Sequence, residues 1–329
     1  YSDTGSFDLD RMSPEMRNWM EGYVDEITYI RDNNVETAPQ KSTNGGKKVA
    51  PLLGNIMWDQ GAPYNNMCPD YDISSKCATG CVATAMAQVM YYHRWPETGK
   101  GSYTYAPAIM GGRTLTADFG STHYSWDDMT PKYDSNSSEA GCDAVAELML
   151  HCGISVSMNY SLSSGAGSDV IPYALFNYFD YDKGVAYRQR SNYSSEEWQQ
   201  IIEDEIDNGR PVIATGRSSS GGHAFVFDGY DENGFVHVNW GWSGMSNGYF
   251  RTSALNPPLQ GTGGSAGGYN YDQQIITGIQ RPKENSCEDV ELVSTEGLVP
   301  AQKTIDNGGS TDISLRGMIY NAGWKASSF

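Results

Sequence analysis

Residues Thr79–Ala85 read TGCVATA, and they mark the point where an irregular stretch of the chain becomes a helix. From Val82 to Met90 apolar residues recur at helical spacing, and the helix should end before Pro96. Cys81 therefore lies at the start of a predicted helix, where the helix dipole and free backbone N–H groups lower the pKa of a thiol. A lone cysteine is more often a buried, inert side chain, so this position indicates a nucleophile only together with other groups.

A histidine further along the chain supplies a candidate base. His223 follows Gly221 and Gly222 and begins a short apolar run with the pattern of a strand. The two glycines leave an open approach to the histidine. A general base for Cys81 needs a ring nitrogen within hydrogen-bonding reach of the sulfur. By itself, a histidine at the start of a strand is more often structural.

The stretch His237–Trp242 reads HVNWGW and contains a third group. In a regular strand Asn239 lies on one face and Trp240 on the other. The side-chain oxygen of Asn239 can accept the Nδ1 proton of His223 and set its tautomer, while the neighbouring indole shields that bond from water. Cysteine, histidine and asparagine follow in this order, the last two roughly 140 to 160 residues after the first, as in papain-type cysteine proteases.

A glutamine upstream of the cysteine is a candidate oxyanion donor. Gln60 lies in a stretch that reads WDQGAPYN, in a region without helical or strand periodicity. Acyl transfer needs donors aimed at the developing negative charge. The side-chain amide of Gln60 and the backbone N–H of Cys81 could supply them. These residues predict Cys81 as nucleophile, His223 as base and Gln60 as oxyanion donor, with Asn239 orienting the base and Trp240 covering it.

Taken together, these segments resemble the streptopain family of bacterial papain-like cysteine peptidases. The resemblance covers about residues 50–283 and, more weakly, residues 1–35. It implies an α+β, papain-like fold of two subdomains, in which a helical half led by the Cys81 helix faces a curved antiparallel sheet across an active-site cleft. It also implies an endopeptidase made as a zymogen, acting through a thiolate–imidazolium pair and an acyl-enzyme. Such an enzyme prefers substrates in which the second residue before the scissile bond is apolar.

The Gly-rich run from Gly261 to Gly268 resembles the mobile active-site loop of that family. Backbone near the catalytic histidine and in this loop is expected to line the substrate cleft, through Gly221, Gly222, Gly263, Gly264 and Ala266. The chain departs from the family pattern in running past the usual end of the catalytic domain near Pro282. It also carries five cysteines besides Cys81.

The chain is expected to divide into three regions. Residues 1–45 are predicted as the end of a propeptide plus a linker, residues 46–283 as the catalytic domain, and residues 284–329 as the start of a β-rich domain or arm. An apolar stripe over 14–31 indicates a helix that docks on the enzyme, and the resemblance implies that this helix belongs to a propeptide that inhibits the enzyme. Further helices are predicted at 139–152 and 194–208, and strands at 211–215, 224–228, 235–239 and 272–280.

The composition of the chain limits the kinds of partner that it can bind. The chain has 329 residues and a net charge of −18, which argues against a phosphate backbone as ligand. No run approaches the roughly 18–20 apolar residues of a membrane span, and no polybasic segment suggests a membrane surface. Protein or peptide substrates are the expected partners, and no cofactor is expected. The resemblance implies a secreted or cell-surface protein, and we expect a monomer.

The other cysteines allow several interpretations. Cys68 and Cys77 can form a disulfide if their Cα atoms lie within about 7 Å. Cys142 and Cys152 fall on one predicted helix, about 15 Å apart along its axis, and should not pair. Cys287 has no assigned role. A metal site from Cys77, Cys81 and His93 does not have the ligand spacing of a zinc framework, so no metal is expected. The other histidines, at 93, 123, 151 and 237, are expected to be structural.

Two other function classes share part of this pattern. An amidase or transglutaminase-like enzyme would use the same cysteine and histidine without cleaving protein chains. A catalytically silent binding module would keep the cleft for recognition. The complete set of Cys81, His223, Asn239 and Gln60 argues against a silent protein.

Overall fold

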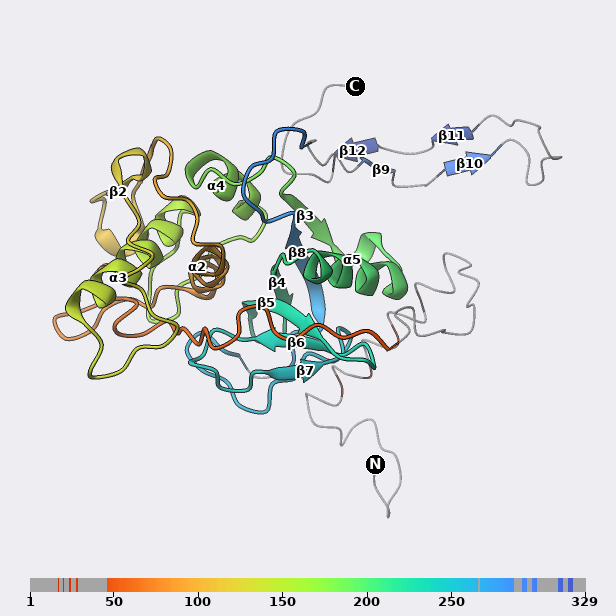
Figure 1. Ribbon diagram of the computed structural model, residues 1–329, viewed down its shortest axis with the longest axis horizontal. Coiled ribbons are helices and arrows are strands. Elements are labelled where there is room, and N and C mark those ends of the chain that lie inside the picture. The colour runs from red at the N-terminus through yellow and green to blue at the C-terminus, as the bar shows by residue number, and fades with distance from the viewer. Residues whose placement is uncertain are drawn as a thin grey trace, which may run out of the picture.

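A computed structural model of the chain describes residues 46–265 and 267–286, four single helical positions between residues 17 and 28, and four short strands after residue 291. Most of the predicted propeptide helix therefore lies outside the described residues, as do Ala266 and Cys287. Within the described part, a group of helices lies on one side and a sheet on the other (Figure 1). The predicted α+β fold with a helical half and an antiparallel sheet is confirmed.

The sheet half is a six-stranded sheet in which neighbouring strands pair antiparallel. Four of its strands were predicted; the other two, β3 and β7, are edge strands too short to show an alternating pattern. In spatial order the strands are β3 (Ala186–Gln189), β8 (Tyr271–Thr277), β4 (Val212–Arg217), β5 (Gly222–Tyr230), β6 (Val236–Asn239) and β7 (Gly248–Phe250).

Alternation along β5 gives the sheet two apolar faces. Ala224 and Val226 belong to the cluster that includes α2 (Cys81–His93), whereas Phe225 belongs to the cluster around α5 (Ser195–Asp207). Successive residues of a strand point to opposite faces, so an uninterrupted apolar run indicates a strand buried on both sides. The helices α2 and α5 therefore cover opposite faces of the sheet, with β5 between them.

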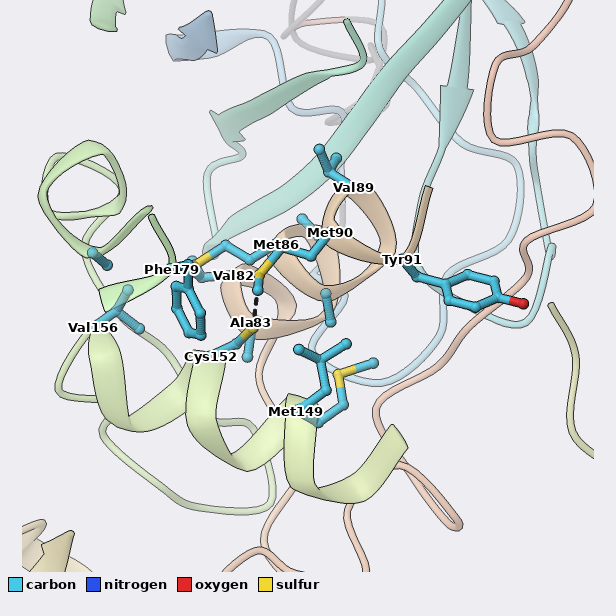
Figure 2. Packing of buried hydrophobic residues seen from close by; sticks show 14 of the residues in the cluster. Val82, Ala83, Met86, Val89, Met90, Tyr91, Met149, Cys152, Val156 and Phe179 are labelled. Atoms are coloured by element: carbon cyan, nitrogen blue, oxygen red, sulfur yellow. Dashed lines mark hydrogen bonds between the residues drawn. The ribbon is translucent and has the colours of Figure 1, made fainter. Parts of the chain in front are cut away.

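The helical half is built on the contact between α2 and α3 (Glu139–Ser155). Their buried side chains interlock in Figure 2, where the thiol of Cys152 donates to the sulfur of Met90 over 3.6 Å. Cys142 and Cys152 both lie on α3 as free thiols, as predicted. Around this pair lie α4 (Ile171–Tyr178), the hairpin of β1 (Ser102–Tyr105) and β2 (Leu115–Asp118), and 3-10 turns at 108–110 and 119–121; a further 3-10 turn at 190–192 lies beside β8.

Local sequence signals explain where the helices end. Arg94 adopts a left-handed conformation after α2, and its N–H donates to the carbonyls of Met90 and Tyr91. This cap closes the helix just before Pro96, which could not continue it. At the start of α5, Ser194 and Glu197 form a capping box in which each side chain binds the backbone of the other. Both helices therefore lie close to their predicted bounds.

The segment after residue 283 contains strands, in line with the β-rich region that was predicted there. Pairing is antiparallel between β9 (Leu292–Ser294) and β12 (Ile319–Asn321), and between β10 (Leu298–Pro300) and β11 (Ile313–Leu315). Whether they form a domain or an arm stays a prediction. Among the described residues, no helix is long and apolar enough to cross a bilayer.

Candidate active site

Cys81 is the first residue of α2, and Gly80 before it has a φ of 89°, in the region that favours glycine. The sulfur lies beside the backbone N–H groups of Ala224 and Val82, which favour the thiolate. Burial nevertheless raises the pKa of the Cys81 thiol, and the neighbouring N–H groups only oppose that effect. The predicted lowering of this pKa is therefore wrong for this conformation, because burial outweighs the helix terminus.

His223 is the second residue of β5, directly before Ala224, whose N–H lies beside the Cys81 sulfur. The protein thus brings together the two residues predicted as nucleophile and base. The imidazole is 2% exposed, and burial lowers its pKa to about 4. Its Nε2–H donates to the carbonyl of Trp240 at 2.8 Å. Since a carbonyl only accepts, the proton sits on Nε2, and Nδ1 is a buried lone pair without a hydrogen-bond partner among the described residues.

The predicted contact between Asn239 and His223 does not form. The Asn239 amide donates to the carbonyl of Ile56 at 2.8 Å, and its oxygen accepts the N–H of Gly241 at 3.1 Å. The strand β6 ends at Asn239, and the chain turns through Gly241 at a φ of 71°. Asn239 therefore holds this turn in place, and the turn carries the Trp240 carbonyl to the imidazole. The atom involved is also different, since His223 donates from Nε2 and not from Nδ1.

The aromatic cover of His223 is a second correction. The ring centroids of His223 and Trp242 lie 4.5 Å apart with an interplanar angle of 19°, whereas the Trp240 ring lies 6.3 Å away. Tyr269 approaches the imidazole from another direction, at 5.2 Å. The stacked cover is thus Trp242, and Trp240 contributes its backbone carbonyl. Both tryptophans were visible in the sequence, but the turn between them decides which ring faces the histidine.

Gln60 lies close to the Cys81 segment, because its carbonyl accepts the N–H of Thr79 at 3.1 Å. Its side chain is 1% exposed, and Nε2 donates to the carbonyl of Thr262 at 2.6 Å. Within the described part of the chain, the amide oxygen has no hydrogen-bond partner. The glutamine therefore meets the Gly-rich loop on one side and, through its backbone, the start of α2 on the other.

The predicted cleft glycines lie where backbone segments approach one another. A Cβ on Gly221 would lie 3.2 Å from Ser265 of the Gly-rich loop, and one on Gly264 would lie 2.8 Å from Gln260. The Ser218 and Ser265 hydroxyls also share a hydrogen bond of 2.8 Å, which ties the loop to the turn before His223. Gly222 opens β5 and is exposed. A role of these glycines in substrate binding stays a prediction.

The disulfide that the sequence allowed between Cys68 and Cys77 is not formed. Cys68 and Cys77 are both free and buried. Burial raises the pKa of Cys68 to about 12 and also raises that of Cys77, so both remain protonated thiols. Within the described part of the chain, no three His, Cys, Asp or Glu side chains are grouped as a metal ion would require.

A cysteine at a helix start, next to a buried histidine on an antiparallel sheet, defines a papain-like cysteine peptidase. Comparison with known proteins gives the family. The sequence model of the Peptidase C10 family matches residues 58–250, and the chain belongs to this family.

Named relatives agree with this family. The chain is 39% identical to streptopain of Streptococcus pyogenes serotype M28 over 299 residues, which covers 85% of this chain and 74% of that protein. It is 36% identical to the thiol protease/hemagglutinin PrtT of Porphyromonas gingivalis, over 98% of this chain and 38% of the relative. Active interpain A of Prevotella intermedia has a similar structure, with a TM-score of 0.66, 36% identity and coverage of 74% of this chain and 99% of its own. A prointerpain A fragment gives a TM-score of 0.65 at 35% identity, over 84% of this chain and 86% of its own.

Proposed function

We propose that this cysteine peptidase is a secreted endopeptidase in which Cys81 is the nucleophile and His223 the general base. The observation that carries the proposal is the shared contact at the start of β5, where the Cys81 sulfur lies beside the N–H of the residue after His223. The Trp240 carbonyl holds the proton on Nε2, so Nδ1 is available to take the thiol proton. The family gives the reaction class, and this geometry supports the proposed roles.

The reaction proceeds through an acyl-enzyme. His223 Nδ1 takes the proton of the Cys81 thiol as the sulfur attacks the peptide carbonyl. The thiol and the imidazole are neutral before this step, and the proton transfer makes the imidazole an imidazolium. The oxyanion accepts hydrogen bonds from Gln60 Nε2 and the Cys81 N–H. The imidazolium protonates the leaving amine, and water then releases the acyl group with His223 again as base. In this scheme the Trp240 carbonyl stabilises the imidazolium, in the place first expected for Asn239.

Residues 1–45 are proposed as the end of an inhibitory propeptide, and the resemblance to a prointerpain A fragment supports this assignment. The start of the described chain is fastened to the catalytic domain. Val49 pairs with Tyr230 by two backbone hydrogen bonds of 2.9 and 3.0 Å, and Leu53 N–H donates to the Asp228 carboxylate at 3.0 Å. A chain beginning near residue 46 should therefore retain these contacts, act as a monomer, and cleave protein substrates faster than the longer form.

Casein hydrolysis under reducing conditions tests the proposal. The wild type should cleave casein, and Cys81→Ala should reduce cleavage by a factor of about a thousand or more. Cys142→Ala is the matched control, because it removes another partly exposed cysteine, on α3, and should keep full activity. Retained cleavage by Cys81→Ala would exclude this nucleophile. If the wild type instead released ammonia from glutamine peptides and left casein intact, the amidase or transglutaminase class would replace the endopeptidase.

A further inference from the structure

The carbonyl of Thr262 in the Gly-rich loop accepts two side-chain hydrogen bonds. One comes from Gln60 Nε2 at 2.6 Å, and the other from Trp242 Nε1 at 3.0 Å. Both donor side chains are almost completely buried, at 1% and 0% exposure. A backbone carbonyl has two lone pairs, so this one is fully used. The loop thereby joins two side chains that come from separate parts of the chain.

Both donors belong to the proposed catalytic site. Gln60 is the proposed oxyanion donor, and Trp242 stacks on the imidazole of His223. An amide side chain can turn either its oxygen or its nitrogen toward a neighbour. Because the Thr262 carbonyl can only accept, it selects the orientation with Nε2 toward the loop. The second N–H of that nitrogen is then left for an oxyanion, whereas the reversed amide would present an acceptor.

The two glycines beside Thr262 allow both contacts. A Cβ on Gly261 would lie 2.7 Å from the Trp242 ring, and one on Gly263 would lie 3.4 Å from the Gln60 amide. Gly263 also has a φ of 73°, which favours glycine. Each glycine thus faces one of the two donors, so the spacing Gly-Thr-Gly lets a single carbonyl lie between the glutamine and the indole.

We propose that the Thr262 carbonyl is a positioning group that holds Gln60 and Trp242 as one unit and sets the oxyanion donor for catalysis. The inference rests on the proposed function, since it assigns a role within that site. In this role the Thr262 carbonyl acts through Gln60 and Trp242. Opening of the loop would break the hydrogen bonds of the Gln60 amide and the Trp242 indole together.

Hydrogen exchange of the two indole N–H groups tests the coupling without turnover. Trp240 provides an internal control, because its Nε1 donates to Ser246 over 3.0 Å and not to the loop carbonyl. A net hydrogen bond is worth about 1 kcal/mol, so Gln60→Ala should raise the exchange rate of the Trp242 Nε1–H about fivefold. The Trp240 rate should change less than twofold. Equal changes at the two indoles, or no change at either, would overturn the coupling.

A double-mutant cycle tests the catalytic consequence. Trp242→Phe keeps a ring against His223 and removes the indole N–H. It should lower kcat for a peptide amide about threefold to tenfold with KM nearly unchanged. In a Gln60→Ala background the same substitution should cost less than about twofold. Leu259→Ala, an exposed side chain just before the loop, should leave kcat unchanged. A full Trp242→Phe loss in the Gln60→Ala background would show that the two side chains act independently.

Alkylation of Cys81 by iodoacetamide distinguishes an effect on the oxyanion donor from an effect on His223, since that reaction forms no oxyanion. Trp242→Phe should change the rate of Cys81 alkylation less than about twofold at each pH tested. A loss in alkylation as large as the loss in kcat would mean that Trp242 acts only through His223, and the inference would fail. A wild type that exchanges as predicted but hydrolyses no peptide would overturn the proposed function and leave the Thr262 contact established.

Discussion

Gly80→Ala adds one methyl group at the point where the chain enters α2, directly before Cys81. The substitution keeps the residue small and adds no charge. Its Cβ would lie 2.6 Å from the sulfur of Met158 and 2.7 Å from the terminal methyl of that side chain. It would also lie 3.2 Å from the carbonyl oxygen of Ser164. Gly80 has a φ of 89° and a ψ of 141°, a combination that L-residues rarely adopt.

Two costs follow from this geometry. Holding a non-glycine residue in such a conformation costs about 1 to 3 kcal/mol. Fitting a methyl group against buried Met158 costs about 1 to 3 kcal/mol more, because that side chain is 0% exposed and has little room to move. Gly80→Ala should therefore lower the free energy of unfolding by about 2 to 6 kcal/mol. Any relief by rotation of the helix start would displace the Cys81 sulfur from the Ala224 N–H.

Urea denaturation and iodoacetamide alkylation measure the two effects. Gly165→Ala is the matched control, because Gly165 lies in the neighbouring loop, has no unusual φ, and leaves open space for a Cβ. This control should change stability by less than about 1 kcal/mol. The Gly80→Ala protein should also be alkylated at Cys81 at least threefold more slowly or faster than wild type. A Gly80→Ala protein as stable as Gly165→Ala, with wild-type alkylation, would refute this account of the helix start.

Three further predictions concern other buried groups. Burial lowers the pKa of His151 from 6.5 to about 4, so the neutral form stabilises the fold above pH 6.5 and this contribution is lost as the pH falls toward 4. Between about pH 7 and about pH 4.5, wild type should lose about 2 to 3 kcal/mol more stability than His151→Gln in urea denaturation, and equal losses would contradict this. Asp228, 1% exposed, accepts from Leu53 and pairs with His237 at 2.6 Å, so Asp228→Ala should cost about 3 kcal/mol in thermal or urea unfolding. Adding His237→Ala should then cost less than about 1 kcal/mol more, and additive losses would show that the pair is not coupled. Finally, alkylation of the unfolded, unreduced protein should modify all five described cysteines, and a protected pair at Cys68 and Cys77 would contradict the free thiols.

Sequence patterns succeeded where the deciding interactions are local. The start of α2 at Cys81, its end before Pro96 and the start of α5 near residue 194 each depend on residues within one turn of the helix. The closeness of Cys81 to the start of β5 also agrees with the sequence, where three motifs in a fixed order are much more specific than any one of them. The catalytic roles of Cys81 and His223 stay predictions. Cys81 lies at the start of α2 and His223 at the start of β5, and the fold brings these two starts close to each other.

Sequence reasoning failed where geometry beyond one element decides. Alternation predicts the faces of Asn239 and Trp240 only while a strand stays regular, and β6 ends at Asn239. The turn through Gly241 then exchanges the expected roles, so that Trp242 covers the histidine and Trp240 supplies a carbonyl. The pKa of Cys81 was misjudged for a related reason: a helix start is visible in sequence, whereas burial of the sulfur depends on the assembled sheet and loops.

The most direct test of the account is to find which residue reacts with an epoxysuccinyl inhibitor of cysteine peptidases. After incubation at neutral pH, the protein is digested and its modified peptide identified by mass spectrometry. The account predicts one adduct, on Cys81, formed at least a hundredfold more slowly in His223→Ala and at a nearly unchanged rate in Asn239→Ala if that variant folds. An adduct on Cys142, or a Cys81 adduct that forms equally fast without the histidine, would contradict the central claim that Cys81 and His223 act as a catalytic pair.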